Sequence, residues 1–305
     1  MKKIAVCGAS GLVGSRLVRQ LHQRSFPLVL VGRKAQPLQE KFPFAIAHYS
    51  WSEFAATPAD DLGTIINLAG AGVTDKAWSE AYKQIMIDSR LNATQTCVEL
   101  CQKNPSIRLI NASAISAYGF YDDDHEVFAE ADTERRTGTC FLQELIDRWE
   151  QATVPAVKAG SSVALLRIGT VFDRQGGALS TIEIPFRYFL GGRFGTGKQI
   201  MSWVSLEDLV AAIEFIFDRP DLNGPINLVS PGACSNRMVA RSLGKAMGRP
   251  SLIPIPAFLI RAMMGQMGQE LVLWGQRASP SKLLAAGFVF QDQDIDAYFQ
   301  KTFRR

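Results

Sequence analysis

Residues 4–14 read IAVCGASGLVG, and this stretch decides the fold. It begins with a short apolar run typical of a buried strand and continues into three glycines that directly precede a helical pattern. In this order of strand, loop and helix, the glycines allow a tight turn, a close approach of backbone to phosphate, and close packing of the helix on the strand. Amide groups at the start of the helix then face a bound anion. The stretch predicts a dinucleotide-binding loop, with cofactor contacts from Gly8, Ser10, Gly11, Leu12, Val13 and Gly14.

Similar apolar runs recur along the first half of the chain and alternate with segments of helical periodicity, of which 78–100 is the longest. Residues that are apolar on both faces are what the strands of a buried parallel sheet require. Helices that cross over between parallel strands give a doubly wound α/β architecture, the Rossmann fold. The strands expected in residues 1–168 are 4–7, 28–31, 44–47, 64–68, 109–112 and 163–166.

The pattern changes after residue 168 to segments rich in glycine and interrupted by proline. A helix that starts near Ser205 and a strand at 225–229 are expected to return to the main sheet. We therefore predict a nucleotide-binding domain over 1–229, with an excursion at about 169–202 that forms a substrate lobe. A smaller, mainly helical C-terminal domain is predicted over 230–305.

The composition is that of an ordinary globular protein. The 305 residues carry a formal net charge of +4, and the charges are scattered, without the basic cluster that a nucleic-acid partner requires. Glycines interrupt the apolar run that a signal sequence would need, and no apolar run is long enough to span a bilayer. We expect a cytoplasmic protein with no nucleic-acid or membrane partner.

No sequence pattern predicts a metal site. The five cysteines lie mostly in apolar contexts, and the three histidines are dispersed. Cys97 and Cys101 are four residues apart on one helical stripe, but no second pair completes a zinc site. The acidic run 122–124 lacks the spacing of a calcium loop. We predict reduced core thiols and no bound metal.

The end of the second strand predicts which nucleotide is bound. An acidic residue there binds the ribose 2′-hydroxyl of NAD and repels a 2′-phosphate. This chain has Gly32, Arg33 and Lys34 at that point, and no carboxylate. Because a guanidinium can pair with a phosphate through two parallel hydrogen bonds, we expect Arg33 to select NADP(H), with Ser10 as a second phosphate donor. The alternative is that Arg33 is only a solvated residue at a helix start.

Further motifs carry a resemblance to a known family. The fourth strand ends in the turn 67–70, whose small residues let the adenine-ribose side of a nucleotide lie against the backbone. This turn, the glycine loop, Ser113 ahead of Tyr118, and the pair 166–167 together resemble the extended short-chain dehydrogenase/reductases. Motifs at 75–78, 89–92, 197–208 and 256–288 make the chain similar to an atypical group of epimerase family proteins. The resemblance implies an NAD-dependent epimerase/dehydratase-like domain with bound NADP(H), followed by a small C-terminal domain of unknown function. The further cofactor contacts expected are Leu68, Ala69, Gly70 and Arg167.

Members of this superfamily that reduce or oxidise carbonyls use a Ser or Thr together with a Tyr and a Lys four residues apart on one helical turn. Ser113 stands in place for the hydroxyl role. The helix that should carry the pair has Cys140 at the tyrosine position and Glu144 at the lysine position. The usual proton donor and the charge that tunes it are therefore both missing. Tyr118 or Tyr121 could supply a proton instead; the alternative for each is a packing or substrate-lining role.

The substrate clamp of sugar-nucleotide enzymes is also missing. Those enzymes place a basic residue shortly after a Gly-x-Gly-x-Gln turn to hold the substrate diphosphate, whereas Gln199 is followed here by IMSW at 200–203. This difference disfavours a nucleotide-sugar substrate. Arg187, Arg193 and Lys198 could bind another anion or remain solvated charges.

Two functions stay open. One is an NADP(H)-dependent oxidoreductase or epimerase-like enzyme that acts on a small-molecule carbonyl substrate, with Ser113 orienting it. The other is a nucleotide-bound regulatory or scaffold protein that kept the pocket and lost the chemistry. A Met-rich stripe over 258–267 would then be available to partners, although such a stripe at helical spacing is more often core or the seam of a homodimer.

Overall fold

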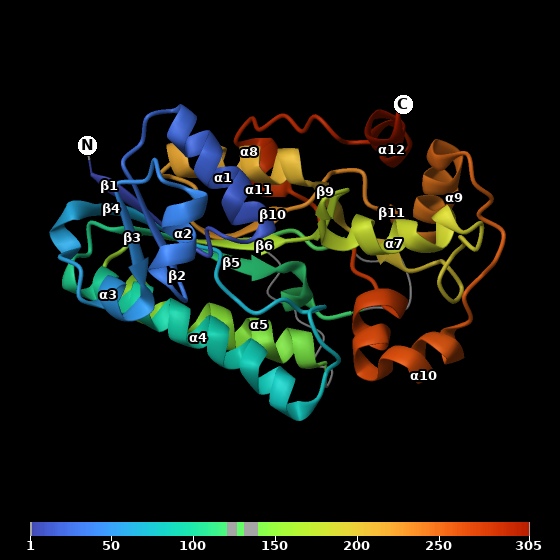
Figure 1. Ribbon diagram of the computed structural model, residues 1–305, viewed down its shortest axis with the longest axis horizontal. Helices are drawn as coiled ribbons and strands as arrows, with labels where there is room; N and C mark the ends of the chain where they lie inside the picture. Colours follow the sequence, from blue (N-terminus) through green and yellow to red (C-terminus); the bar gives the residue numbers. More distant parts are fainter. Residues whose placement is uncertain (1, 121–126, 131–139, 305) are drawn as a thin grey trace. The chain divides into compact units, whose positions relative to one another are not determined.

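The computed structural model describes residues 2–120, 127–130 and 140–304 (Figure 1). Tyr121 and the acidic run 122–124 lie outside the described residues. The chain forms two compact units that are each discontinuous in sequence, and the excursion predicted at 169–202 lies in the same unit as the C-terminal residues. The N-terminal unit comprises Met1–Ser113, Glu144–Arg167 and Val210–Ile226, and the C-terminal unit comprises Ala114–Gln143, Ile168–Leu209 and Asn227–Arg305.

A seven-stranded sheet forms the centre of the N-terminal unit. Its strands are β1 (Lys3–Cys7), β2 (Leu28–Gly32), β3 (Ala47–Ser50), β4 (Leu62–Asn67), β5 (Arg108–Ala114), β6 (Val163–Ile168) and β10 (Gly224–Leu228). The order across the sheet is β10-β6-β5-β4-β1-β2-β3, and β1 is parallel to both of its neighbours. The chain thus starts in the middle, builds one half of the sheet, and returns to build the other. This is the doubly wound Rossmann topology, which confirms the predicted fold.

The helices that contribute to this unit are α1 (Leu12–Gln23), α2 (Ala35–Lys41), α3 (Trp51–Ala55), α4 (Glu80–Lys103), α5 (Phe141–Gln151), α6 (Val154–Lys158) and α8 (Leu206–Asp218). Figure 1 shows α1 and α8 on one face of the sheet and α3, α4 and α5 on the other. Helix α1 buries Leu17, Val18 and Leu21, which recur at helical spacing. On the opposite face, Cys97 and Cys101 of α4 pack in one hydrophobic cluster with residues of the central strands.

The C-terminal unit contains two small two-stranded sheets, and its residues 230–305 are mainly helical, as predicted. Its elements are β7 (Thr170–Asp173), α7 (Gly177–Arg187), β8 (Ile200–Met201), β9 (Trp203–Ser205), β11 (Cys234–Ser235), α9 (Asn236–Met247), α10 (Ala257–Gly268), a π-helix (Gln269–Leu273), α11 (Ser281–Ala285) and α12 (Ile295–Phe303), with a 3-10 helix at Ile115–Tyr118. The core is aromatic. Phe172 stacks on Trp203 with ring centroids 5.7 Å apart, and the hydroxyl of Tyr298 donates a 2.8 Å hydrogen bond to the carbonyl oxygen of Phe172.

One strand begins later than predicted. We expected it at 44–47, whereas β3 runs over Ala47–Ser50. The aromatic residues before it pack elsewhere, because Phe42 is buried and the ring of Phe44 stacks on His22 with centroids 3.9 Å apart. As a half-buried edge strand, β3 lacks the apolar run that marks the central strands.

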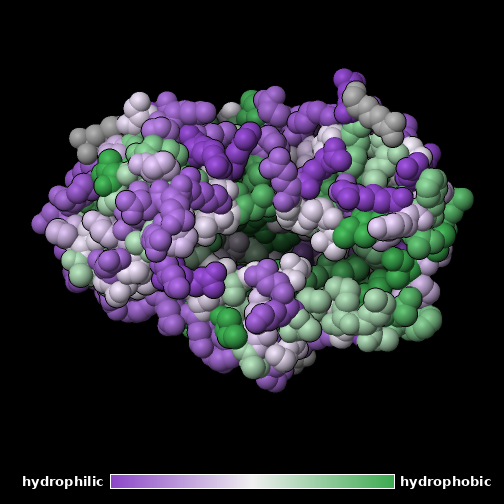
Figure 2. Space-filling model, viewed as in Figure 1, coloured by the Kyte–Doolittle hydropathy of each residue, from purple (hydrophilic) through white to green (hydrophobic). Residues whose placement is uncertain are grey.

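The Met-rich stripe over 258–267 is not core. It lies on α10, where Phe258 and Met263 are 72% and 76% exposed and Ile260 is buried. Figure 2 shows apolar residues gathered at the surface over this helix. The role of this stripe as a homodimer seam stays a prediction.

In the part of the chain that the structure describes, no helix combines the length and the hydropathy needed to cross a bilayer. The five cysteines are free and buried. Among the described residues, no group of His, Cys, Asp and Glu side chains is arranged to hold a metal ion.

A buried arginine joins β5 to the end of α8. Arg108 donates two hydrogen bonds from Nη1 to the carbonyls of Ile216 and Phe217, at 2.7 and 3.2 Å. Two more run from Nη2 to the carbonyls of Arg219 and Leu222, at 3.1 and 2.8 Å. The carbonyls at a helix end have no partner within the helix, so this side chain supplies donors that the end of α8 needs.

We predict that Arg108→Met lowers the free energy of unfolding by about 3 kcal/mol, because it leaves buried carbonyls without donors. Urea unfolding followed by circular dichroism measures the change. Arg16→Met, on the exposed side of α1, is the matched control and should alter the free energy by less than about 0.5 kcal/mol. Equal values for the two variants would contradict the role given to Arg108.

Candidate functional site

The glycine loop between β1 and α1 packs so closely that two of its positions exclude a side chain. Gly8 has a φ of +80°, and a Cβ there would lie 2.8 Å from the carbonyl carbon and oxygen of Leu68. A Cβ on Gly14 would lie 2.3 Å from the carbonyl oxygen of Gly8, so α1 approaches the loop as closely as backbone allows. Gly11 has more room, since a Cβ there would meet only the Gly8 oxygen, at 3.4 Å.

The start of α1 is open to an anion. Its N-cap residue is Gly11, no side chain caps it, and its first turn has no acidic residue. Ser10 and Gly11 are exposed, and Leu12 and Val13 are half-buried. Backbone N–H groups in a first helical turn lack intrahelical acceptors and carry the positive end of the helix dipole. The loop residues predicted from the sequence are therefore brought together in a geometry that suits a phosphate.

Two cations lie at the edge of this loop. Arg33 directly follows β2 and is exposed, without an ion-pair partner among the described residues. Lys41, in the last turn of α2, donates a 3.1 Å hydrogen bond from Nζ to the carbonyl oxygen of Ser10. The sequence analysis missed Lys41, because only the folded path of α2 brings it back to the loop.

The turn after β4 is held from behind by a buried polar network. Asn67 donates from Nδ2 to Oδ1 of Asn111 at 2.7 Å and to Oγ1 of Thr94 at 3.2 Å. Its own Oδ1 accepts a 3.2 Å hydrogen bond from the amide of Ala69. Leu68 and Ala69 are half-buried and Gly70 is exposed, so this predicted cofactor turn presents backbone at the surface of the unit.

A second residue that the sequence analysis missed supports the same turn. Arg90 of α4 is buried, donates from Nη1 to the carbonyls of Ala71 and Met86 at 3.0 and 3.1 Å, and lies over the ring of Trp149. Desolvation by burial lowers the pKa of Arg90 to about 10, so the guanidinium stays charged at neutral pH. A Cβ on Gly70 would lie 3.1 Å from this side chain. Arg90 therefore holds the turn in place from the interior of the N-terminal unit.

Ser113 and Arg167 meet at a carboxylate. Glu150 of α5 accepts a 2.6 Å hydrogen bond from Oγ of Ser113 and 2.9 Å bonds from Nε and Nη2 of Arg167. All three side chains are buried, and they join β5, α5 and β6. The ion pair gives Arg167 a structural role, and the cofactor contact predicted for it stays a prediction. The ion pair also fixes the orientation of the Ser113 hydroxyl.

Two family models match the chain. The model described as the NAD dependent epimerase/dehydratase family covers residues 4–229. The chain belongs to this family. A second model, the Domain of unknown function (DUF1731), covers residues 255–302. These matches confirm the resemblance seen in the sequence motifs.

Several epimerase family proteins are similar over nearly their whole length. One from Mycobacterium bovis is 36% identical over 292 residues, which are 96% of this chain and 94% of that protein. One from Staphylococcus haemolyticus is 32% identical and matches over 98% of both chains. The crystal structure of human epimerase family protein SDR39U1 (isoform 2) with NADPH aligns over 99% of both chains, with a TM-score of 0.86 and 25% identity.

For a member of the epimerase/dehydratase family, the two positions expected to carry Tyr and Lys have unusual surroundings. Cys140 is buried, and its thiol donates a 3.0 Å hydrogen bond to Oε2 of Glu270, in the π-helix. Desolvation and this carboxylate raise the pKa of Cys140 to about 12, so it is a neutral thiol at pH 7. Glu144 is exposed and pairs with Arg148 at 2.5 Å. Neither side chain can replace a tyrosine activated by a lysine.

Glu270 has a further task in the C-terminal unit. Its carboxylate accepts hydrogen bonds from the amides of Phe141 and Leu142, at 3.0 and 2.9 Å, where α5 begins. A buried acid at this place satisfies amides of the first turn that have no other partner in the helix. With Nε2 of Gln266, which donates at 2.7 Å, the thiol of Cys140 is thus one of four donors around a single carboxylate.

Tyr118, the alternative proton donor, is fully buried in the C-terminal unit. Its ring stacks on Phe128 with centroids 5.1 Å apart. Its hydroxyl donates to Oδ1 of Asn227 at 2.9 Å and lies 3.2 Å from the carbonyl oxygen of Ala129. These contacts fit the packing role that the sequence analysis gave as the alternative, and the catalytic role of Tyr118 stays a prediction.

The glycine loop yields a direct test of its packing. We predict that Gly14→Ala lowers the melting temperature of the ligand-free protein by several degrees, since its Cβ would overlap the Gly8 carbonyl. Gly11→Ala is the matched control in the same loop and should leave the melting temperature within about one degree. Differential scanning calorimetry makes the comparison. A Gly14→Ala protein as stable as the control would mean that α1 lies farther from the loop.

Proposed function

We propose that this chain binds NADP(H) and acts as an oxidoreductase or epimerase-like enzyme on a small carbonyl compound. The observation that carries the proposal is an uncapped helix start flanked by Arg33 and Lys41, with no carboxylate at the end of β2. A 2′-phosphate adds negative charge beside the adenosine ribose, where these cations favour it and an acid would repel it.

The glycine loop fits a dinucleotide because backbone atoms, and not side chains, form the surface that the phosphates approach. At positions 8 and 14 there is no room for a side chain, and at position 11 the glycine leaves the amides accessible. The amides of Leu12 and Val13 would hold the diphosphate, whereas that of Gly11 donates to the carbonyl oxygen of Gly8 at 3.1 Å. Arg33 and Lys41, with the hydroxyl of Ser10, would hold the 2′-phosphate. The human relative crystallised with NADPH supports the same choice.

A bound nicotinamide supplies the means to give a hydride to a carbonyl carbon or to take one from an alcohol. The protein's own contribution is to orient the substrate and to exchange a proton. Ser113 donates its hydrogen to Glu150, so the oxygen lone pairs of Ser113 remain to accept a hydrogen bond from a substrate hydroxyl. The Arg167–Glu150 pair keeps that hydroxyl in one orientation. In this scheme the proton comes from a group other than Cys140, whose thiol is neutral and committed to Glu270.

A second function has one observation in its favour. The positions that carry Tyr and Lys in active members hold a buried thiol and an exposed glutamate. A protein that kept the nucleotide loop without this pair would act as an NADP(H)-bound regulatory or scaffold protein. The two functions share the cofactor and differ in turnover.

We predict that Arg33→Gln weakens NADPH binding about tenfold and leaves NADH binding nearly unchanged, because only NADPH carries the phosphate that the guanidinium pairs with. Lys41→Gln should act in the same direction. Fluorescence titration with each nucleotide gives the two dissociation constants. Lys103→Gln, an exposed charge at the end of α4, is the control and should not alter their ratio. An unchanged ratio in Arg33→Gln would reject the phosphate assignment.

Turnover separates the two functions. We expect the purified protein to oxidise NADPH with at least one member of a panel of aldehydes, ketones and quinones, followed at 340 nm in a single-turnover experiment. Ser113→Ala should slow the reverse reaction, oxidation of the alcohol product by NADP+, by at least about tenfold while keeping NADPH affinity, because it removes the acceptor that orients the substrate hydroxyl and leaves the cofactor contacts in place. Tight NADPH binding without turnover on any member would favour the regulatory protein.

A further inference from the structure

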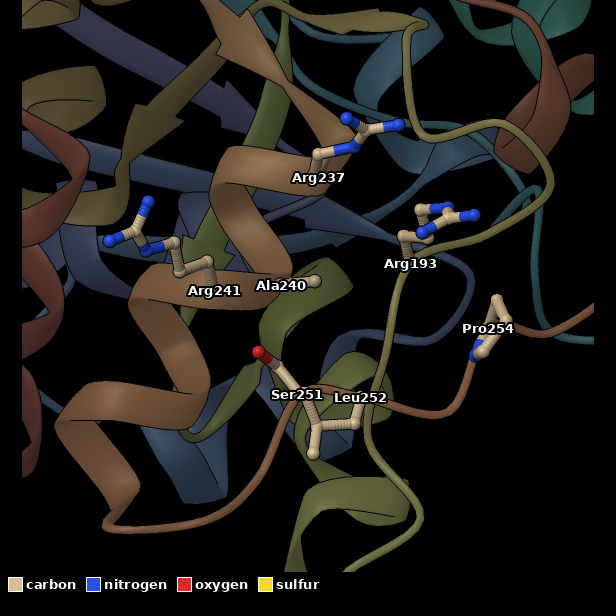
Figure 3. Close-up of a pocket in the computed structure, with 7 residues that line it drawn as sticks. All are labelled: Arg193, Arg237, Ala240, Arg241, Ser251, Leu252 and Pro254. Carbon is tan, nitrogen blue, oxygen red and sulfur yellow. The ribbon is translucent and has the colours of Figure 1, made fainter.

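The C-terminal unit has a pocket of its own, lined by three arginines. Its volume is about 220 Å³, and Figure 3 shows the side chains around it. Arg237, Ala240 and Arg241 come from one side of α9, and Arg193 comes from the loop before β8. The remaining wall is the segment after α9, which contributes Ser251, Leu252 and Pro254.

Backbone hydrogen bonds hold the two walls of this pocket together. The amide of Ile255 donates to the carbonyl oxygen of Arg193 at 2.9 Å, and the amide of Ile253 donates to that of Gly191 at 3.3 Å. A Cβ on Gly192 would lie 1.9 Å from the Ile253 oxygen, so the two segments run in direct contact. The arginine-bearing loop is thus fixed beside the segment after α9.

The positive charge of the pocket has no acidic counterpart in its walls. Arg193 donates from Nε to the carbonyl of Gly195 at 3.4 Å, and Arg237 donates from Nη2 to that of Thr196 at 3.3 Å. Among the described residues, Arg241 has no hydrogen-bond or ion-pair partner. The sequence 231–269 contains no Asp or Glu at all. Figure 3 shows the guanidinium groups of Arg193 and Arg237 pointing to one side and that of Arg241 pointing to the other. A bound anion would offset the positive charge of these side chains.

We propose that this pocket binds the phosphate group of a phosphorylated ligand. Guanidinium groups offer planar pairs of donors that match phosphate oxygens, and a phosphomonoester carries close to two negative charges at pH 7. The hydroxyl of Ser251 adds a polar group, while Ala240, Leu252 and Pro254 give an apolar surface for the rest of the ligand. The site uses the C-terminal unit alone and is independent of the cofactor proposed above.

The phosphate can belong to a soluble metabolite or to a lipid headgroup. Leu252 in the pocket wall is 82% exposed, and Ile253 beside it is 47% exposed. Further exposed apolar residues, Phe189 and Leu190, lie shortly before Arg193 in the chain. These side chains give the lipid source a physical basis, because they can enter a membrane interface while arginines pair with headgroups.

Isothermal titration calorimetry with inorganic phosphate and glycerol 3-phosphate tests the site. We expect saturable binding with a Kd of about 1 mM or tighter, weakened at least about tenfold by Arg241→Gln and abolished by Arg237→Gln/Arg241→Gln. Lys245→Gln, one turn farther along α9 and outside the pocket, removes the same charge and should change the Kd less than about twofold. Arg33→Gln should retain this binding, which separates the pocket from the nucleotide loop.

Sedimentation with vesicles of phosphatidylcholine, with or without phosphatidic acid, identifies the source. Binding to the phosphatidic acid vesicles that is lost in the Arg237→Gln/Arg241→Gln protein assigns the phosphate to a lipid. Binding of the soluble phosphates alone assigns it to a metabolite. The proposal is overturned if no phosphate probe binds, or if the double variant binds every probe as the wild type does. Unchanged NADPH affinity in the double variant keeps this result separate from that of the nucleotide site.

Discussion

The carbonyl oxygen of Gly8 lies where a side chain on residue 14 would have to be, and this single contact sets the geometry of the N-terminal unit. It brings α1 onto the end of β1 so that the helix amides open at the edge of the sheet. The turn after β4 has to be equally close, because a Cβ on Gly8 would strike Leu68. Asn67 and Arg90 hold that turn in place from the interior. The dinucleotide site is therefore a gap between backbones, maintained by buried polar groups behind it.

Sequence reasoning recovered the parts of this arrangement that have local signals. The central strands were found because buried parallel strands are apolar on both faces, and the loop was found because its glycines have a fixed spacing. The predicted position of the edge strand β3 was three residues too early. The residues of β3 are only half-buried, and the apolar residues from Phe42 to Ile46 before it have the composition of a strand. Lys41, Arg90 and Glu150 were missed for another reason. Each acts through a contact with a residue distant in the chain, and no spacing in the sequence encodes that contact.

Contacts between residues distant in the chain also explain why the roles of the predicted catalytic residues could not be read from the sequence. Ser113 and Arg167 were recognised by their motifs, yet their common partner Glu150 gives Arg167 a structural task. In the sequence, Cys140 at the tyrosine position indicates only that the usual proton donor is missing. In the structure that thiol and two backbone amides donate to Glu270, the acid that binds the first turn of α5. A reaction in this family member would need a proton route that differs from the usual one.

The discontinuity of the two units has a consequence for how the protein is made. The polypeptide passes from one unit to the other five times, and the strand β10 that completes the N-terminal sheet is supplied by Gly224–Leu228. During synthesis on the ribosome, the edge of the sheet beside β6 is therefore unpaired when β6 has been made. More than fifty further residues are synthesised before β10 can pair with that edge. Neither unit corresponds to a continuous gene fragment, so truncation at any codon before that of Ile226 leaves both incomplete.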